Sequence, residues 1–349
     1  MKKLLKILTI PLLLVLLAIV SFVSYLTVNE YRPLPIESIP AAPSAQKVDA
    51  TKPLSLATYN IGYGGLDETT DFFMDGGKNV QPESKQRVEQ NMAEITHTMK
   101  EADADVYLLQ EVDRRAKRSY EINQEAYFQK QLQMNSLFAY NFKVAYVPIP
   151  LPPIGRVESG LTTLTNLSVT HAQRVDLPNP FKWPVRIANL NRALLETRLP
   201  IANSDKELVI FNLHLEAYDN GKGKIAQSKK LADVLAEEYA KGNYVIAGGD
   251  FNQAFEGSHI FPTNEQDGWA PGTISEKELP AHFSFAFDDT YPTVRVLNAP
   301  YTGDYHTSQV HVIDGFIVSD NLTVEEIHVL DKDFKASDHQ LVKINLRFL

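Results

Sequence analysis

The sequence predicts an α/β fold in which short apolar strands alternate with amphipathic helices. Lys85–Lys100 carries apolar side chains at every third or fourth position, which is typical of a helix that buries one face, and an apolar run begins soon afterwards at Val106. Ile225–Lys241 repeats this helical pattern, and Gly242 ends it just before the apolar run Tyr244–Gly248. Helical and strand-like segments therefore follow each other along the chain, as they do in α/β proteins.

Length and composition agree with this fold class. The chain has 349 residues, of which 44% are hydrophobic, as in an ordinary globular protein. About 300 residues follow the N-terminal segment, enough for one large α/β domain or two small ones. No internal repeat is visible. The remaining β-rich part contains four further strand-like runs, which are Gly160–Thr165, Leu194–Arg198, Val312–Val318 and Leu341–Leu346.

The N-terminal segment predicts a membrane anchor. Ile7–Val28 is almost wholly apolar and long enough to cross a bilayer core of roughly 30 Å. Lys2, Lys3 and Lys6 precede it, which predicts an N-terminus on the inner side of the membrane. The alternative is a signal peptide that is cleaved. The run is long for such a peptide and no clear cleavage motif follows, which favours an uncleaved signal anchor.

We therefore expect three parts: a signal anchor at residues 1–29, a proline-rich linker at 30–52 and a folded domain at 53–349. The domain would face outward on a single-pass protein of the cell membrane, or would be secreted if the segment is cleaved. The formal net charge is −9, so without the three N-terminal lysines the remainder carries −12. An acidic domain is not typical of a general nucleic-acid binder, although it does not exclude a nuclease with a bound cation and a local basic patch.

Six apolar runs each end in polar side chains suited to a hard cation or a phosphate. Carboxylate and amide oxygens favour magnesium or calcium. The chain has no cysteine and no pair of histidines at the spacing of a zinc site. The six runs are Leu54–Asn60, Val106–Glu111, Leu208–His214 with Asn212, Ile246–Asn252 with Asp250, Ile313–Phe316 with Asp314, and Ala336–His339 with Asp338.

The spacing within these runs suggests shared sites. Asp250 and Asn252 are two residues apart, so an extended segment would present both side chains on one face. Asp338 offers an oxygen ligand next to His339, whose imidazole could act as an acid, a base or a phosphate contact. Strand ends are also the positions at which α/β folds carry their functional loops. These runs therefore predict one crevice.

The ordered set of residues resembles the endonuclease/exonuclease/phosphatase superfamily, whose members include deoxyribonuclease-I-like enzymes, exonuclease-III-like repair enzymes, bacterial sphingomyelinases and inositol-polyphosphate 5-phosphatases. The resemblance runs from Leu54 to the C-terminus. It implies two packed β-sheets flanked by helices, a four-layer α/β/β/α sandwich. The residues that carry it are Asn60, Gln110, Glu111, His214, Gly249, Asp250, Phe251, Asn252, Asp314, Ser337, Asp338 and His339.

The resemblance also implies a metal site. Glu111 would be the main metal carboxylate, helped by Asn60 and by Asp338. The expected ion is Mg²⁺, with Mn²⁺ as a possible substitute. Asp250 would position or deprotonate the attacking water, and Asn252 would hold a phosphate oxygen.

Three histidine and aspartate assignments complete the catalytic set. His339 would stabilise charge on the phosphoryl oxygens, with Asp314 fixing its ring. His214 would serve the leaving group, or else be satisfied by backbone partners. Asn212 would contact the phosphate or support a residue that does. Arg115, in the basic stretch after Glu111, would form part of a phosphate-binding rim, unless that stretch is a solvated loop.

The expected reaction is metal-dependent hydrolysis of a phosphoester, in particular a phosphodiester, by in-line attack of water. A lipid-derived substrate suits the anchor and the acidic domain. Extracellular DNA or RNA suits the superfamily and needs the basic stretch after Glu111. A non-catalytic surface protein that keeps the fold is the third class. The sequence indicates the membrane as a partner of the N-terminal helix and no obligate protein partner.

Overall fold

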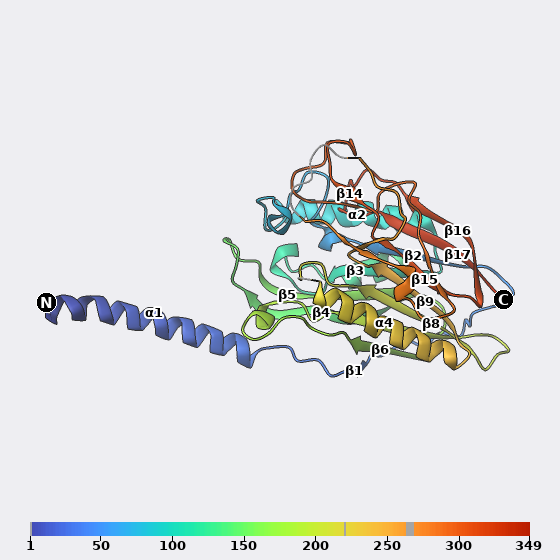
Figure 1. The fold of residues 1–349 in the computed structure, drawn as a ribbon, viewed down its shortest axis with the longest axis horizontal. Coiled ribbons are helices and arrows are strands. Elements are labelled where there is room, and N and C mark those ends of the chain that lie inside the picture. The colour runs from blue at the N-terminus through green and yellow to red at the C-terminus, as the bar shows by residue number, and fades with distance from the viewer. Residues whose placement is uncertain (1, 220, 263–268) are drawn as a thin grey trace.

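The computed structural model describes residues 2–219, 221–262 and 269–349. Two β-sheets pack face to face, with helices on their outer faces and a long apolar helix projecting from the domain (Figure 1). This arrangement confirms the four-layer sandwich expected from the sequence.

The sheets differ in size and both are mixed. The larger has seven strands in the order β1 (Ile36–Ser38), β6 (His171–Asp176), β7 (Ala193–Pro200), β8 (Glu207–His214), β9 (Tyr244–Asp250), β15 (Asp314–Ser319) and β12 (Phe283–Ala286). The smaller has six in the order β16 (Leu322–Leu330), β17 (Leu341–Phe348), β2 (Leu54–Asn60), β3 (Val106–Asp113), β5 (Gly155–Thr165) and β4 (Asn135–Val147).

Short elements connect these layers. Two small sheets pair β10 (Gln253–Phe255) with β11 (Gly272–Ile274), and β13 (Val294–Arg295) with β14 (Val310–His311). Five short 3-10 helices are η1 (Gly62–Gly64), η2 (Phe73–Asp75), η3 (Lys117–Ser119), η4 (Val185–Ala188) and η5 (Glu276–Glu278).

The layer between the sheets is the main apolar core. Because side chains alternate along a strand, one set from each central strand enters this layer. Leu56 and Leu108 enter it from the six-stranded sheet, and Ile210, Ile246 and Phe316 from the seven-stranded sheet. All five side chains are buried, so the hydrophobic effect holds the two sheets together.

The outer faces are covered by helices. The other side-chain set of β2 and β3, including Tyr59 and Tyr107, packs under α2 (Lys85–Ala102). Phe211 and Val245 of the larger sheet pack under α4 (Lys222–Ala240). The third domain helix is α3 (Gln124–Leu132). Each helix buries one apolar stripe, as the periodicity of the sequence predicts for α2 and α4.

Helix α1 (Lys2–Val28) is long and apolar enough to cross a membrane. Its segment Thr9–Val28 has a mean hydropathy of 2.4 and is almost entirely exposed. The following segment, expected as a linker at 30–52, lies along the domain: β1 pairs with β6, and Val48 forms a bridge to Ile201. The chain is therefore attached to the sheet edge soon after α1 ends.

Candidate active site

The polar residues converge because, on one face of each central strand, the side chains change from aliphatic to polar along the strand. The side chains that enter the inter-sheet layer are aliphatic at first, such as Leu56, Leu108 and Ile246, and polar at the strand end. Polar positions of this series are Asn60, Gln110, His214 and Asp250 at strand ends and Asp314 at the start of antiparallel β15, all of them buried.

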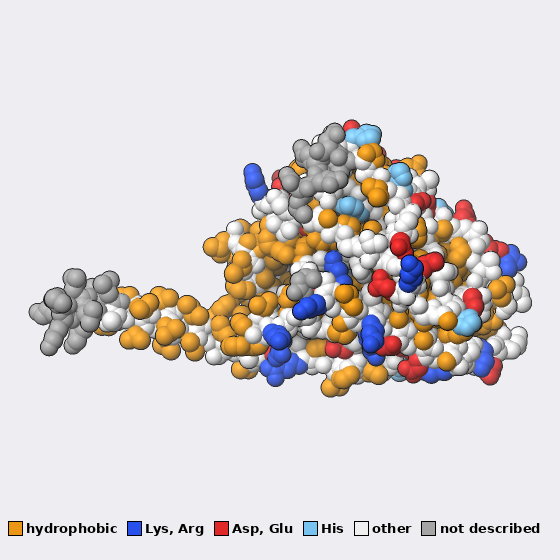
Figure 2. Space-filling view, viewed as in Figure 1, with side chains coloured by type: hydrophobic (Ala, Val, Ile, Leu, Met, Phe, Trp, Pro, Cys, Tyr) orange, Lys and Arg blue, Asp and Glu red, His pale blue; other side chains and the backbone are white. Residues whose placement is uncertain are grey.

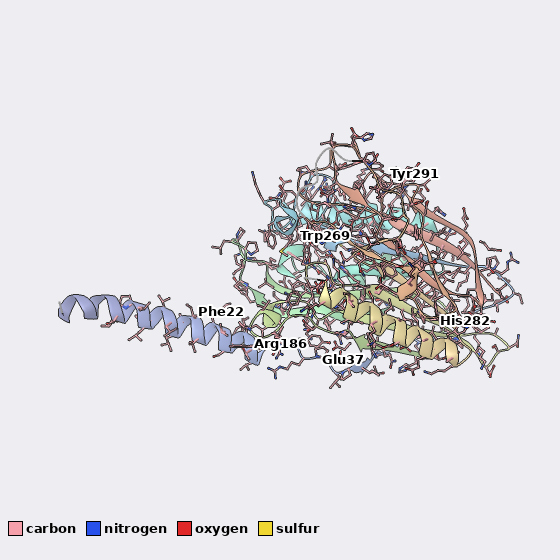
Figure 3. All side chains as sticks on the ribbon, in the orientation of Figure 1. Phe22, Glu37, Arg186, Trp269, His282 and Tyr291 are labelled. Carbon is pink, nitrogen blue, oxygen red and sulfur yellow. The ribbon has the colours of Figure 1, made fainter. Side chains whose placement is uncertain are left out.

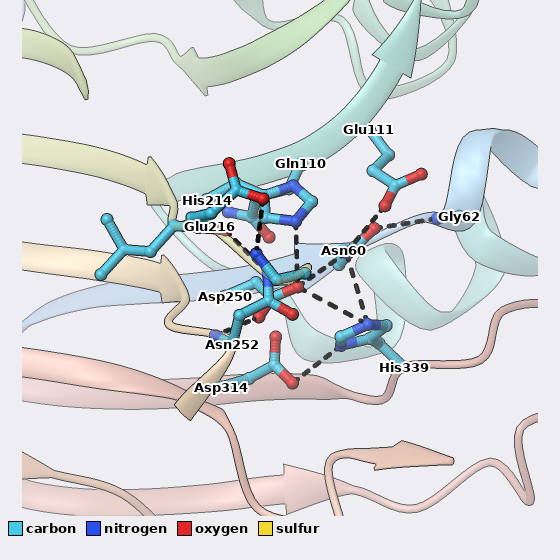
Figure 4. Close-up of polar contacts among 12 residues, drawn as sticks. Asn60, Gly62, Gln110, Glu111, His214, Glu216, Asp250, Asn252, Asp314 and His339 are labelled. Carbon is cyan, nitrogen blue, oxygen red and sulfur yellow. Dashed lines mark hydrogen bonds and ion pairs between the residues drawn. The ribbon is translucent and has the colours of Figure 1, made fainter. Parts of the chain in front are cut away.

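Strand register brings these ends together. β2 and β3 are parallel, as are β8 and β9, so their C-terminal ends lie at one edge of the sandwich. In the larger sheet His214 and Asp314 are both register partners of Asp250. Figure 4 shows side chains of both sheets pointing toward one another around Asp250 and Asn60. The predicted crevice is therefore built from six separate segments of the chain.

Glu111 reaches the cluster through a break in strand regularity. The pairing of β3 with β5 shifts register between Leu109 and Val112, and Glu111 has a left-handed φ of 55°. A non-glycine residue rarely adopts this conformation, and a bulge redirects the side chain that it carries. Without the bulge, alternation would place Glu111 on the face toward α2; with it, the carboxylate lines the cavity.

His339 and Asp314 form a buried pair. The Nδ1 of His339 lies 2.9 Å from Oδ2 of Asp314, and its Nε2 lies 3.7 Å from Oδ2 of Asp250. Burial alone lowers the pKa of His339, but the carboxylates of Asp314 and Asp250 outweigh it and raise this pKa to about 10. The ring is therefore an imidazolium at neutral pH, with Nδ1 donating to Asp314.

Asp250 is the most connected carboxylate of the cluster. Its Oδ1 accepts the backbone N–H of Asn252 (2.8 Å), and its Oδ2 accepts Nδ2 of Asn60 (3.0 Å) and lies 3.4 Å from Nε2 of His214. Burial raises its pKa to about 6, against the opposing effect of His339 and with a further rise from Asp314. Asp250 is thus ionised at neutral pH and can accept a proton within a physiological range.

The side-chain amide of Asn60 points its Nδ2 donor toward the cluster. Its Oδ1 accepts the backbone N–H of Gly62 (3.1 Å), which fixes the orientation of the amide. Its Nδ2 faces Asp250, Glu111 (3.4 Å) and Nε2 of His339 (3.4 Å). In this arrangement Asn60 orients carboxylates, and binding a cation through Oδ1 would require the amide to turn over.

Glu111 and Asp338 offer a donor set that fits a hard cation. Burial, opposed by His339 and reinforced by Glu111, raises the pKa of Asp338 to about 7. A buried carboxylate whose proton affinity is raised by a second carboxylate is an arrangement that a divalent ion relieves. Gly62 packs closely beside Asp338, and a Cβ there would lie 2.7 Å from Oδ1.

A second group could also hold a metal by distance alone. Ligand atoms of Asp250, Asp314 and His339 all lie within 4.8 Å of one another. However, Nδ1 of His339 is already bonded to Asp314, and a protonated imidazole repels a cation. By this chemistry the carboxylates of Glu111 and Asp338 fit a cation better, and the second group is a charge-compensated network.

His214 is buried and neutral. Burial lowers its pKa well below the usual range, and the positive charges of Arg192, His339 and Arg118 lower it further. Its Nδ1 has no hydrogen-bond partner among the described residues. Because the ring is neutral at neutral pH, it can protonate a leaving oxygen only after it has taken up a proton, and Oδ2 of Asp250 lies 3.4 Å from its Nε2.

Asn252 enters the site by a turn. Strand β9 ends at Asp250, and Asn252 has a left-handed φ of 51°, so strand alternation does not explain its position. Its Nδ2 donates to the carbonyl of Leu215 (2.9 Å), and its side chain lines the cavity. The residue reaches the site that the Asp-x-Asn spacing predicts, for a different geometric reason.

Two residues expected to contact substrate lie elsewhere. Asn212 is fully buried between the sheets, where its Nδ2 donates to the carbonyls of Leu109 and Thr162 and its Oδ1 accepts Nε2 of Gln110 (2.8 Å). It supports the strand ends and does not line the cavity. Arg115 is exposed and pairs with Glu121 (3.0 Å).

Two arginines line the cavity next to the cluster: Arg118, from the basic stretch after Glu111, and Arg192, which the sequence analysis does not assign. The cavity has a volume of about 430 Å³. Arg118 lines it and is held by Asp113 (3.0 Å), and Arg192 lines it with Nε 3.9 Å from Glu216. Within the described residues, Nε and Nη1 of buried Arg192 have no hydrogen-bond partner. Buried guanidinium donors without hydrogen-bond partners are suited to an anionic ligand.

Solved structures with the same fold support this reading of the architecture. An endonuclease/exonuclease/phosphatase from Beutenbergia cavernae is 18% identical, with a TM-score of 0.56 over 85% of this chain and 72% of that one. Truncated Caenorhabditis elegans TDP2 is 17% identical, with a TM-score of 0.54 over 86% and 99%. The human Nocturnin catalytic domain is 14% identical, with a TM-score of 0.53 over 89% and 98%.

At these identities the likeness shows the fold alone. No curated protein matches the chain. The model of the endonuclease/exonuclease/phosphatase family, whose members hydrolyse phosphoesters, matches residues 57–339, which include every residue of the cluster described above. The chain therefore belongs to the endonuclease/exonuclease/phosphatase family.

Proposed function

We propose that the protein is a metal-dependent phosphodiesterase that acts outside the cell from a membrane anchor. The observation that carries the proposal is the buried set of Asp314, His339 and Asp250 beside Glu111 and Asp338, at the open end of the sandwich. This set combines a fixed positive charge, a carboxylate poised to take a proton and oxygen ligands for a cation.

Glu111 and Asp338 would hold Mg²⁺ or Mn²⁺, with Asn60 between them and Asp250. The ion supplies Lewis-acid polarisation of a phosphoryl oxygen when it is bound. The protein contributes the orientation of both carboxylates. The bulge turns Glu111 into the cavity, and the close packing of Gly62 confines Asp338.

Asp250 would align the attacking water and accept its proton. The Asn252 N–H fixes its Oδ1 and the Asn60 amide fixes its Oδ2, so the carboxylate is held in one orientation where it lines the cavity. His339, held as an imidazolium by Asp314, would stabilise negative charge on the phosphoryl oxygens. Asn252 would add an amide donor, and His214 would pass to the leaving oxygen the proton that Asp250 takes from the water.

Extracellular nuclease activity is the alternative function, and the basic stretch after Glu111 argues against it. Arg114 pairs with Glu125, Arg115 with Glu121 and Arg118 with Asp113. These three arginines are neutralised by the protein itself, which leaves Lys117 as the cation that the stretch offers to a phosphate backbone. The substrate class that we favour is a lipid-derived phosphodiester.

The first prediction concerns the reaction and its metal. The full chain in detergent should hydrolyse a chromogenic phosphodiester with Mg²⁺ or Mn²⁺ and lose this activity with chelator, because the proposed ligands are oxygens. In a panel of plasmid DNA, RNA, sphingomyelin and phosphatidylinositol phosphates, a lipid should be the better natural substrate. Glu111→Gln should weaken Mg²⁺ binding measured by calorimetry.

Glu89→Gln is the matched control, because Glu89 is an exposed residue of α2 paired with Lys85 (3.7 Å). It should leave both Mg²⁺ affinity and turnover unchanged. Full activity without any divalent ion would contradict the mechanism, and DNA as the preferred substrate would favour the nuclease alternative.

The second prediction compares the proposed catalytic residues with an ordinary histidine–aspartate pair on the surface. His339→Ala and Asp250→Asn should each lower kcat by roughly a hundred- to a thousandfold, because each removes a group that acts on transition-state charge or on the water. Asp314→Asn should give a smaller defect of the same kind. His282, which pairs with Asp320 (2.7 Å) on the surface, is the control, and His282→Ala should have no effect on kcat.

Thermal unfolding of all four variants should be followed alongside the kinetics, so that a folding defect is recognised. Near-wild-type kcat in a folded His339→Ala variant would show that the site is elsewhere.

The third prediction compares Arg192, which lines the cavity, with the exposed Arg115. Arg192→Ala should lower kcat/KM roughly ten- to a hundredfold, because it removes a charge-assisted contact to the substrate anion. Arg115→Ala, at the exposed position expected from the sequence, should leave kcat/KM almost unchanged. Steady-state kinetics on the chromogenic substrate measures both. A larger loss at Arg115 than at Arg192 would reverse the assignment.

A further inference from the structure

Two neighbouring loops carry large apolar side chains on their outer sides. One is the β4–β5 hairpin loop, residues 148–154, in which Ile149 is 73% and Leu151 86% exposed. The other joins β6 to β7 and contains Trp183, 54% exposed, and Val185, 58% exposed. We call these four side chains the apolar rim. Figure 2 shows hydrophobic side chains gathered on the side of the domain that faces α1.

The loops of the rim contact the last turns of α1. The indole Nε1 of Trp183 donates to Oγ1 of Thr27 (3.1 Å), and the ring of Phe22 packs against Tyr146 with centroids 6.0 Å apart. Arg186 pairs with Glu30 (2.7 Å), which follows the helix. Figure 3 shows Phe22 and Arg186 on the two sides of this junction.

These contacts fix the depth of the rim relative to α1. Phe22 precedes Val28 by six residues, which is roughly 9 Å along a helix axis. If the apolar segment Thr9–Val28 lies in a bilayer, Tyr146 and Trp183 lie at the level of its outermost part. Tyrosine and tryptophan are the side chains that favour this interfacial level.

The inner sides of the same loops form a wall of the active-site cavity. Val147, Ile149 and Ile154 line it from the hairpin, and Phe181 and Leu190 from the second loop. A continuous apolar surface thus leads from the rim into the cavity that holds Arg192 and His339. An inorganic phosphate makes no use of such a wall, whereas the acyl part of an amphiphile packs against it.

Basic side chains border the rim. Lys182 is exposed next to Trp183, and Lys117 lies at the base of the hairpin, where its Nζ donates to the carbonyl of Pro153 (3.3 Å). Apolar side chains bordered by lysine are complementary to a bilayer surface with anionic headgroups. The protein's own net charge of −9 would otherwise oppose such an approach.

We propose that the apolar rim inserts into the interface of the membrane that holds α1, and that the cavity takes a phosphoester-bearing lipid directly from this membrane. The inference rests on the proposed phosphodiesterase activity and on the placement of α1 in a bilayer. It adds a second contact between the domain and the membrane, and this contact sets the direction in which the cavity opens.

The fourth prediction uses Trp183 as the reporter. The chain has two tryptophans, Trp183 and Trp269, so Trp269→Phe leaves one. The full-length variant is reconstituted into phosphatidylcholine vesicles containing anionic lipid. Lipids brominated near the headgroup end of the acyl chain should quench its fluorescence strongly, and lipids brominated at the chain terminus weakly. A protein that resists carbonate extraction but shows no quenching would contradict insertion of the apolar rim and would still support the membrane anchor.

Leu151→Asp and Val185→Asp test the function of the rim. Neither side chain lines the cavity, so both variants should hydrolyse the soluble chromogenic substrate at the wild-type rate. Each should lower turnover of the lipid substrate in vesicles about ten- to a hundredfold, because one inserted aliphatic side chain is lost. Thr323→Asp, on exposed strand β16, is the control and should leave turnover of both substrates unchanged.

The outcomes separate the claims. Loss of turnover of both the soluble and the lipid substrate in every variant would point to a folding defect, which thermal unfolding detects. In that case Leu151→Ala replaces Leu151→Asp. Unchanged lipid turnover in folded rim variants would overturn the inference without affecting the proposed chemistry. A change of oligomeric state in light scattering, without lipid quenching, would identify a second copy of the chain as the occupant and also overturn it.

Discussion

A buried imidazole held between two buried carboxylates is the interaction on which the candidate site depends. Asp314 and Asp250 face each other as register partners of β15 and β9, and His339 lies against both. Each isolated charge at this depth would cost several kcal/mol. The imidazolium of His339 lies against both carboxylates and offsets the cost of burying negative charge there, so the geometry of the sheet and the charge state of the site are coupled.

The rest of the site follows from the same constraint. The inter-sheet layer is aliphatic at its centre, where Leu108 and Phe316 hold the sheets together, and polar at one end. Polar side chains there must find partners, because unsatisfied buried groups are costly. Asn60 connects the two sheets by donating to Asp250, and Asn212 does so by donating to the carbonyl of Leu109. The polar end of the core is thus both the join between the sheets and the reactive surface.

Local patterns in the sequence predict the central strands well. The runs ending at Asn60, Glu111 and His214 are strands in the structure, with ends within about two residues of the expected ones. Helix α2 ends two residues later than expected, and α4 begins three residues earlier. The strands are buried on both faces, and the helices have clear periodicity. Strand β4 (Asn135–Val147) and helix α3 were not expected, since polar and aromatic residues interrupt their patterns. Segment 30–52 reads as a linker because its partners at β6 and Ile201 are distant in sequence.

The site residues also divide into those that local sequence patterns predict and those that depend on contacts distant in the sequence. Asp250, Asp314 and His339 follow from motif order, whereas Arg192 lies in a stretch with no motif and is recognised only by its burial and unpaired donors. Arg115 is suggested by a basic run, but local acidic partners such as Glu121 occupy that run. The bulge at Glu111 has no signal in the sequence, since a left-handed glutamate is a consequence of long-range pairing.

Side-chain protonation tests the central claim most directly. Nitrogen NMR of isotope-labelled histidine rings reports the protonation state of each ring. The measurement is made on the metal-free full chain at about pH 8, well above the ordinary histidine pKa of about 6.5. The account predicts that His339 is still an imidazolium, with Nδ1–H in a strong hydrogen bond that Asp314→Asn weakens, while His214 is neutral. A neutral His339 at this pH, titrating as an ordinary surface histidine does, would contradict the charge-compensated network.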